Sequence, residues 1–548
     1  MAGPRFAGIW REDDRARAAY SEGAGIYRIV PRAVAIPSTT RALVDIVRWA
    51  GAEGVPLVPR GSGSGMPGGN VGDGVLVDLT VLDGAPLAVN ATAFEATTGT
   101  ATRLGSLDAE AGRFGLRMPV DPSSARFATV GGAVSTNAAG SRTVRYGPVR
   151  RWVTGLSLVT AGGRLVRLER GQPASDPTLA AIEEEIGTTL RLAKWRVATG
   201  YPRVRKNTAG YALDAYLESG DLLDLIIGAE GTLGFVTDVS WRLEPIPPYR
   251  AGVRAGLRDL KRLTHCLPAL LELAPSRLEF LDASFLRFVE EAVRALPRGD
   301  RLVGGAVLLM LELEGPDPAA VDRDLERAVG ILRSESIDVE VGRDGPEIDT
   351  LWAIRHAASP KLASLGNTMR SLQVIEDACV PVLRLGEYLL AVQAIAGQRG
   401  VPVVMFGHAG DGNVHANLLA NVTEPGWEGR VKAIFDDVSQ LVVAMGASPS
   451  GEHGDGRLRA GLVDRVYGAE VGQLLRVVKR AFDPNGIMNP GIKLGDGEPI
   501  SRLKVGAQAA PIDPEIAAGL RRIERDAGYS TGRLQLADDP GTISVQTD

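Results

Sequence analysis

The chain has few cysteines and no long run of apolar residues. Two cysteines in 548 residues, Cys266 and Cys379, are too few for an iron–sulfur cluster, which needs about four thiolates. So low a count is typical of a reducing cytoplasm. No stretch reaches the roughly 18 apolar residues of a membrane span, and the first twenty residues are charged where a secretory signal would be apolar. We therefore expect a cytoplasmic protein without a transmembrane segment, either free or peripheral to the inner face of the membrane.

The chain also lacks an excess of positive charge. Its net charge is −5 and its isoelectric point is about 5.8, which argues against a nucleic-acid binder because such proteins usually carry a strongly basic face. Hydrophobic residues make up 45% and charged residues 23% of the chain, as in ordinary soluble globular proteins. At this length we expect more than one domain.

Histidine is scarce as well, and its placement is informative. Three of the five histidines fall in two glycine-rich stretches, His408 and His415 within 407–415 and His453 within 451–454, beside Glu452. Two histidines and a carboxylate on irregular backbone are the ligand types of a divalent-metal site, and the remaining histidine could serve as a base. The alternative is a set of hydrogen-bonded loop histidines. This concentration indicates an enzyme rather than a scaffold.

The spacing of His408 and His415 constrains the local backbone. Residues seven apart point to opposite faces of a regular strand, and the glycines between them disfavour a helix. We therefore expect a glycine-rich turn that brings both rings to one point. A strand over 414–419 should follow, with His415 and Asn417 on the same face.

Three further stretches, 60–70, 119–147 and 227–237, are rich in glycine and small residues. The first lies between strands predicted at 55–59 and 74–79, and no helix pattern follows it, which disfavours a dinucleotide-binding βαβ unit. The stretch is either a flexible surface loop or a nest of backbone N–H groups around a pyrophosphate. The small and hydroxyl-bearing residues of the second stretch favour the nest, because a flat cofactor needs a groove lined by backbone.

These motifs carry a family resemblance. The three glycine-rich loops resemble the FAD domain of the vanillyl-alcohol oxidase/p-cresol methylhydroxylase superfamily. Segments 406–417, 450–457 and 482–491 resemble its D-2-hydroxyacid dehydrogenase branch, which includes the D-lactate, glycolate and D-2-hydroxyglutarate dehydrogenases. The resemblance covers residues 30 to 495 in the expected order.

The resemblance implies an α+β fold. It places a two-subdomain FAD-binding domain of the vanillyl-alcohol oxidase type at residues 1–245 and an α+β cap or substrate domain with the metal site at 246–470. A C-terminal segment, 471–500, would return to the FAD domain. Residues 501–548 form a polar tail with one helix near 514–527, and its end, 538–548, is unfolded by composition.

The resemblance also implies which residues bind FAD. They are Arg60, Gly61, Ser62, Gly63, Ser64, Gly65, Met66, Pro122, Ser123, Thr129, Gly131, Gly132, Ser135, Thr136, Asn137, Gly140, Tyr146, Gly147, Glu230, Gly234, Val236 and Asn489. We expect the FAD to be non-covalent, because no histidine precedes His265 and neither cysteine lies in an FAD motif.

Within the family, the residues matching His408, His415 and Glu452 bind a divalent metal, here Zn²⁺, Fe²⁺ or Mn²⁺. His453 would be the general base, or alternatively a partner that orients Glu452. In this arrangement a 2-hydroxy acid would bind the metal as a chelating ligand.

Four further residues are implied as contacts of the substrate. Arg355, in a Leu-Trp-x-x-Arg motif, would grip the substrate carboxylate. Ser359 stands where a relative's hydroxyl contacts substrate, Asn417 is a candidate hydrogen-bond donor to the substrate, and Arg370 stands where 2-hydroxyglutarate enzymes carry a lysine.

The sequence therefore predicts an FAD- and metal-dependent dehydrogenase that oxidises a D-2-hydroxy acid to the 2-oxo acid by hydride transfer to flavin. D-2-Hydroxyglutarate and D-lactate are the first substrates to consider. Electrons would pass to an acceptor such as an iron–sulfur protein, an electron-transfer flavoprotein or a quinone, and a homodimer is compatible with the sequence. The alternatives are a glycolate dehydrogenase or oxidase subunit and a flavin electron-relay subunit of a larger complex, although a relay needs neither metal nor base.

Overall fold

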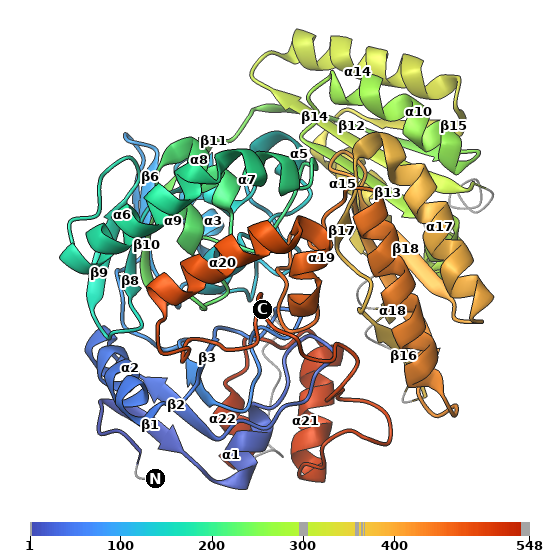
Figure 1. Cartoon of the computed structure of the whole chain (residues 1–548). Helices are drawn as coiled ribbons and strands as arrows, with labels where there is room; N and C mark the ends of the chain where they lie inside the picture. Colours follow the sequence, from blue (N-terminus) through green and yellow to red (C-terminus); the bar gives the residue numbers. More distant parts are fainter. Residues whose placement is uncertain (1–2, 295–304, 357–360, 363–364, 367, 539–548) are drawn as a thin grey trace.

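A computed structural model describes residues 3–294, 305–356, 361–362, 365–366 and 368–538 of the chain (Figure 1). It confirms the α+β fold class, with three main sheets and helices packed against them. Two of these sheets belong to the N-terminal half, and the third belongs to the segment that follows the proline-rich stretch at 245–248. No helix in the described part of the chain is both long and apolar enough to cross a bilayer.

The first sheet has four strands in the order β1-β2-β4-β3. Its strands and adjoining helices are β1 (Gly8–Arg11), α1 (Asp14–Ala19), β2 (Ala33–Pro37), α2 (Thr40–Glu53), β3 (Leu57–Arg60) and β4 (Val75–Asp78). The Thr39 side chain caps α2, and Gly54 ends it with φ +65°, in keeping with the preference for threonine at helix N-caps and glycine after helix C-termini. β3 and β4 are parallel neighbours, so the glycine-rich loop crosses one edge of the sheet without a helix.

The second sheet has five antiparallel strands in the order β5-β6-β10-β8-β9. Its strands are β5 (Ala88–Asn90), β6 (Glu95–Gly99), β8 (Val153–Val159), β9 (Leu165–Glu169) and β10 (Phe235–Arg242). The helices of this part are α3 (Leu104–Gly112), α4 (Val130–Thr136), α5 (Thr143–Tyr146), η1 (Val149–Arg151), α6 (Pro177–Leu192), α7 (Lys194–Gly200), α8 (Leu213–Ser219) and α9 (Leu223–Ile226). A short ribbon pairs β7 (Leu116–Arg117) with β11 (Glu244–Pro245).

The third sheet runs in the order β15-β12-β14-β13-β18-β19-β16, and β17 also pairs with β19. Its strands are β12 (Tyr249–Leu257), β13 (Arg277–Asp282), β14 (Val307–Gly315), β15 (Ser336–Gly342), β16 (Met369–Leu372), β17 (Ala378–Cys379), β18 (Val403–His408) and β19 (Asn413–Asn421). Its helices are α10 (Leu260–Leu271), α11 (Ala283–Phe288), α12 (Glu290–Arg294), α14 (Pro318–Arg333), α15 (Gly345–His356), η2 (Val382–Arg384), α17 (Leu385–Gln398) and α18 (Trp427–Ala444).

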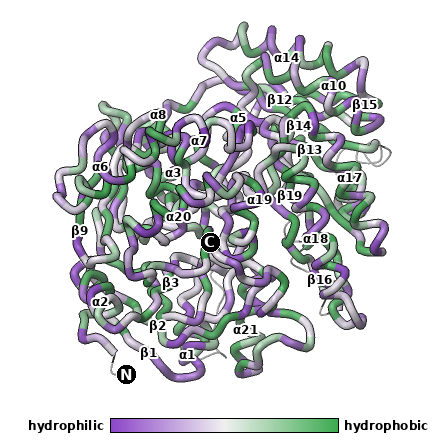
Figure 2. Tube along the Cα trace, in the orientation of Figure 1, coloured by the Kyte–Doolittle hydropathy of each residue, from purple (hydrophilic) through white to green (hydrophobic). Residues whose placement is uncertain are grey.

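The burial of β14 explains its apolar sequence. All nine of its residues are buried. Leu309 and Leu311 face one hydrophobic cluster, whereas Leu308 and Met310 face another on the opposite side of the sheet. A strand covered on both faces needs no alternation of polar residues. The amphipathic α14, in which hydrophilic and hydrophobic residues alternate (Figure 2), covers part of this sheet.

The chain then returns to the N-terminal half. The connecting elements are η3 (Ala460–Leu462), α19 (Val463–Tyr467) and α20 (Ala469–Phe482). Leu475 and Val478 of α20 share a hydrophobic cluster with β8 and β10, and Ile487 and Met488 join the cluster around α2.

The C-terminal segment contains α21 (Pro514–Arg525) and α22 (Arg533–Asp538). Ile516, Leu520 and Leu536 are buried in one cluster with Ala16 and Tyr20 of the N-terminal region, so the two ends of the described chain lie side by side (Figure 1). The composition predicts a polar tail and does not reveal this buried contact. Residues 539–548, most of the end predicted to be unfolded, lie outside the described residues.

Candidate functional site

A tight hairpin places two of the predicted metal ligands together. β18 ends at His408, the turn contains Gly410 and Gly412, and β19 carries His415 opposite Phe406. The two Nε2 atoms are 3.3 Å apart. The sequence predicts this turn from its glycines, and Gly412 has a positive φ of 72° that suits glycine.

The third predicted ligand arrives from a separate loop. Glu452 Oε1 is 3.2 Å from His408 Nε2 and 3.3 Å from His415 Nε2. Atoms bound at about 2.0–2.1 Å to a tetrahedral ion lie about 3.3 Å apart. The three donor atoms therefore form a triangle of the size that one metal ion requires.

Buried carboxylates orient the three histidines. Glu279 bonds His408 Nδ1, and Glu376 Oε2 lies 2.7 Å from His453 Nδ1 and 3.6 Å from His415 Nδ1. The bonds to His408 and His453 occupy Nδ1, the longer contact places a carboxylate beside Nδ1 of His415, and all three rings direct Nε2 at the triangle. Carboxylates that hold the far nitrogen in this way are characteristic of histidines at metal sites.

Asp377 fixes the loop that carries Glu452. Its carboxylate accepts hydrogen bonds from the backbone N–H groups of Glu452 at 3.0 Å and His453 at 2.8 Å, and from Ser450 Oγ and Asn413 Nδ2. These donors occupy both oxygens, so Asp377 positions the loop rather than serving as a ligand.

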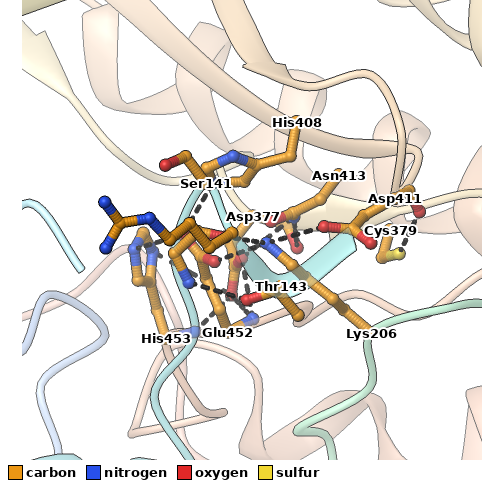
Figure 3. Close-up of polar contacts among 12 residues, drawn as sticks. Ser141, Thr143, Lys206, Asp377, Cys379, His408, Asp411, Asn413, Glu452 and His453 are labelled. Carbon is orange, nitrogen blue, oxygen red and sulfur yellow. Dashed lines mark hydrogen bonds and ion pairs between the residues drawn. The ribbon is translucent and has the colours of Figure 1, made fainter. Parts of the chain in front are cut away.

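A buried lysine joins the two halves of the chain at this site (Figure 3). Lys206 Nζ lies 2.8 Å from Glu452 Oε2 and 3.3 Å from both Asp411 Oδ2 and the carbonyl oxygen of Gly140. Lys206 therefore binds the oxygen of Glu452 that lies outside the triangle, and it leaves one carboxylate oxygen for a metal.

The site holds a surplus of negative charge. Five buried carboxylates belong to it, namely Glu279, Glu376, Asp377, Asp411 and Glu452. Among the described residues their cationic partners are fewer, namely Lys206, Arg355 and Arg459 within the cluster and the partly exposed Arg205 at its edge. Buried charge is costly unless it is balanced, so the surplus favours a bound cation.

The pKa values reflect the same imbalance. Burial lowers the pKa of His408, but the Glu279 and Glu452 carboxylates together outweigh burial and raise the pKa to about 9. Burial lowers the pKa of His453 too, yet Glu376 and Asp377 raise it to about 10. Protons on these rings offset the carboxylates where no metal is bound, and a divalent cation would replace them.

A cavity adjoins the triangle, and Glu452 and His453 form part of its wall. Seventeen of the predicted cofactor residues line it: Arg60, Gly61, Ser62, Gly63, Ser64, Gly65, Met66, Pro122, Ser123, Thr129, Gly131, Gly132, Ser135, Thr136, Glu230, Gly234 and Val236. Among the described residues, no backbone N–H group from Ser62 to Met66 donates a hydrogen bond to the protein. Five such amides in one loop are suited to hold a pyrophosphate, so the cavity fits the predicted FAD.

The other predicted cofactor residues lie outside this lining. Asn137 ends α4 and accepts from the Arg150 N–H, Gly147 ends α5, and the Tyr146 hydroxyl donates to Glu314. Asn137 and Gly147 therefore have local roles, whereas Tyr146 links α5 to β14 of the third sheet.

Gly140 and Asn489 also lie outside the lining, where they hold the loops together. A Cβ at Gly140 would lie 2.5 Å from the Asp121 backbone. Asn489 Nδ2 donates to the carbonyl oxygens of Gly69 and Glu230.

The predicted substrate contacts are divided. Arg355 Nε donates to Glu279 at 3.0 Å and its guanidinium lies over Phe406, so Arg355 is one carboxylate away from His408. Asn417 shares the β19 face of His415. Arg370 instead contacts Glu524 of α21, and Ser359 lies outside the described residues.

Sequence reasoning assigned no role to six residues of the site: Lys206, Glu279, Glu376, Asp377, Asp411 and Arg459. Glu376 and Asp377 left one signal, because they are adjacent acids within the apolar run 374–380. A buried acid pair is rare unless it is bonded to something. Lys206 and Glu279 lie outside every motif.

Comparison with known proteins agrees with this geometry. A family model described as an FAD binding domain matches residues 31–169, and one described as the C-terminal domain of FAD linked oxidases matches residues 246–492. The 4-ethylphenol oxidase of Gulosibacter chungangensis has the same fold, with a TM-score of 0.63 at 15% identity over 88% of this chain and 94% of that chain.

Three relatives match this chain over nearly the whole of their own length. An FAD-linked oxidoreductase of Mycobacterium tuberculosis is 30% identical, over 85% of this chain and 91% of that protein. The D-lactate dehydrogenase of Archaeoglobus fulgidus is 29% identical (84% and 92%), and the glycolate oxidase subunit GlcD of Bacillus subtilis is 28% identical (85% and 89%). The chain spans about half the length of the D-2-hydroxyglutarate dehydrogenases that it matches.

Fold and cavity thus define an FAD-dependent oxidoreductase of the vanillyl-alcohol oxidase type. Within that class, the chain belongs to the FAD-linked oxidases related to the D-lactate, D-2-hydroxyglutarate and glycolate dehydrogenases.

Proposed function

We propose that the chain is an FAD- and divalent-metal-dependent dehydrogenase that oxidises a D-2-hydroxy acid to the 2-oxo acid and passes the electrons to an external acceptor. One observation carries the proposal. The triangle of His408, His415 and Glu452 opens onto the cavity that fits FAD, because Glu452 and His453 line that cavity. A substrate held at the triangle would therefore lie beside the cofactor.

The donor set suits Zn²⁺, Fe²⁺ or Mn²⁺. Three protein ligands leave coordination positions open, which the hydroxyl and one carboxylate oxygen of a 2-hydroxy acid can fill. Lys206 keeps Glu452 monodentate, since it binds the second carboxylate oxygen at 2.8 Å, and so preserves those positions. A bound cation would polarise the hydroxyl and lower its pKa.

His453 would take the hydroxyl proton. Its Nδ1 is held by Glu376 at 2.7 Å, and its Nε2 lies 3.6 Å from Glu452 Oε1, so Nε2 faces the triangle. Arg459 holds the other oxygen of Glu376 at 2.8 Å and so fixes the carboxylate. This arrangement orients His453 as carboxylates orient basic histidines in other enzymes.

FAD, when bound, supplies the acceptor for the hydride that leaves the substrate α-carbon. The described lining of the cavity contains no cysteine and, apart from His453, no histidine, which supports non-covalent attachment. Cys379 is buried and its thiol donates to the carbonyl oxygen of Asp411.

Arg355 is placed to bind the substrate carboxylate. Its Nε is taken by Glu279, while the planar guanidinium lies 4.8 Å over the centroid of Phe406. Glu279, which also bonds His408, fixes the position of the Arg355 guanidinium. The two terminal nitrogens of the guanidinium are suited to a substrate carboxylate.

The test is the visible spectrum of the purified protein without oxygen. D-Lactate, D-2-hydroxyglutarate and glycolate are added in turn, and bleaching of the flavin bands by at least one of them is expected. Treatment with a chelator should abolish bleaching, and added Zn²⁺ or Mn²⁺ should restore it.

Two histidine variants complete the test. His415→Ala should lose the bound metal and the bleaching but keep the flavin. The exposed His265, 77% accessible and paired with Glu335, provides the matched control, since His265→Ala should keep metal, flavin and bleaching. Flavin that stays oxidised with every 2-hydroxy acid would exclude the proposal.

A further inference from the structure

The position of Arg370 in the third sheet separates it from the metal site. Arg370 pairs with Ala420 and Ser371 pairs with Leu419 across β16 and β19. Side chains alternate between the two faces of a sheet, so Ser371 shares the face of His415 and Asn417. Arg370 and Leu372 lie on the opposite face of the sheet, and Leu372 belongs to the hydrophobic cluster that contains Leu309 and Leu311.

The C-terminal segment engages the Arg370 guanidinium. Arg370 lies 3.2 Å from one oxygen of Glu524, and Lys504 Nζ lies 2.9 Å from the other. The side chains of Arg370, Glu524 and Lys504 are 16%, 26% and 7% exposed. Burial raises the pKa of Glu524, but the charges of Lys504 and Arg370 outweigh burial and lower it. Glu524 thus stays ionised and balances Arg370.

The segment that carries Glu524 is anchored on the FAD-binding half. Ile516 and Ile523 of α21 are buried beside α1, and the backbone of Lys504 bonds the carbonyl oxygen of Ile26. The match to the C-terminal family model ends at residue 492, so this anchoring belongs to a part of the chain beyond that model.

Neutral polar groups occupy the metal-side face in place of Arg370. Ser371 Oγ donates to Asn417 Oδ1 at 3.2 Å, and Gln373 Nε2 lies 3.4 Å from Ser371 Oγ. Asn417 is two residues from His415 on the same strand, so a group that extends from the metal along β19 would first meet these side chains. None of the three carries a charge.

We propose that the specificity of the site is set by Ser371 and Asn417, and that Arg370, engaged by Glu524, takes no part in binding. The substrate is then a 2-hydroxy monocarboxylate with an uncharged side chain rather than a dicarboxylate. This inference rests on the proposed function and narrows its substrate class. Among the described residues, Ser371, Gln373 and Asn417 offer no cation to a distal carboxylate, and desolvating a carboxylate without one is costly.

Two acids of equal chain length test the proposal. D-2-Hydroxypentanoate and D-2-hydroxyglutarate both have five carbons and differ in the second carboxylate. We measure kcat/KM for each acid with a dye acceptor, for the holoenzyme and for the variants Arg370→Gln and Ser371→Lys. The wild type should prefer D-2-hydroxypentanoate, and Arg370→Gln should leave the ratio of the two within about twofold.

Ser371→Lys introduces a cation on the metal-side face and should raise the relative rate with D-2-hydroxyglutarate roughly tenfold, the size of one charge-assisted contact. Gln373→Lys serves as a second variant if Ser371→Lys does not fold. Arg370→Gln and Glu524→Gln should both increase amide hydrogen exchange in α21, because each removes the same ion pair; this readout does not depend on activity.

The opposite result is equally specific. If Arg370→Gln lowers kcat/KM for D-2-hydroxyglutarate about tenfold and spares D-2-hydroxypentanoate, Arg370 binds the distal carboxylate and the inference is wrong. Flavin bleached by none of D-2-hydroxypentanoate, D-2-hydroxyglutarate, D-lactate and glycolate in the wild type would overturn the proposed function and this inference together. Bleaching by D-2-hydroxyglutarate alone would overturn only the inference.

Discussion

Replacing Lys206 with methionine should destabilise the protein in a way that metal reverses. Lys206 is buried and balances two carboxylates, Glu452 at 2.8 Å and Asp411 at 3.3 Å. At an effective dielectric constant near 20, a charge pair at about 3 Å is worth about 5 kcal/mol before desolvation. Removing one partner of a buried pair typically costs about 3–5 kcal/mol. We expect a loss of this size when no metal is bound.

The loss translates into a measurable melting shift. Unfolding entropy of about 2.1 cal/mol/K per residue gives roughly 1.2 kcal/mol/K for a chain of this length, so the expected fall in Tm is about 3–4 °C. A divalent cation at the triangle supplies the missing positive charge beside Glu452. Thermal melts of the wild type and Lys206→Met, each with a chelator and with Zn²⁺, should show a larger metal-induced rise in the variant.

Lys493 offers a matched control. It is also buried, and it lies 3.1 Å from both Glu230 and Asp455, neither of which belongs to the triangle. Lys493→Met should cost a comparable amount of stability that metal does not restore. Equal responses to Zn²⁺ in the two variants, or a Lys206→Met protein that melts like the wild type in chelator, would refute the reasoning.

Two more substitutions probe the cavity and the loop that carries Glu452. A Cβ at Gly131 would lie 1.8 Å from Thr100 Oγ1, so Gly131→Ala should lower the flavin content measured at 450 nm and cost about 1–3 kcal/mol of stability by overpacking. Gly112→Ala meets nothing within 4 Å and should keep its flavin; equal flavin content in the two would contradict the argument. Asp377→Asn loses a carboxylate oxygen that accepts N–H groups and should weaken metal retention roughly 10–100-fold in equilibrium dialysis, while an unchanged metal affinity would show that Asp377 does not position the loop.

The local elements could be predicted because local chemistry determines them. Thr39 and Gly54 are residue types that commonly begin and end helices, as they do at α2, and the apolar residues of β14 suit a strand that is buried on both faces. The hairpin after His408 follows from its glycines, since the turn needs backbone angles that favour glycine.

The partners of the site residues could not be predicted in the same way. Glu279 bonds His408 because β13 pairs with β18. No sequence feature near Glu279 predicts that pairing. The pairing register of β16 determines which face of the sheet carries Arg370, because a shift of one residue would move Arg370 to the opposite face. The family resemblance aligned Arg370 with a lysine of related enzymes, but it could not show on which face of the sheet Arg370 lies in this chain.

The contacts between the halves of the chain have a consequence for recombination. Lys206 and Glu230 come from the first half, whereas Glu452, Asp455 and Lys493 come from the second. A chimaera joined at the proline-rich stretch 245–248 would keep each sheet intact yet separate every one of these partners from its match. A chimaera of two related proteins should therefore fold only when the incoming half carries the matching charged residues. The two halves of the chain are expected to evolve together for this reason.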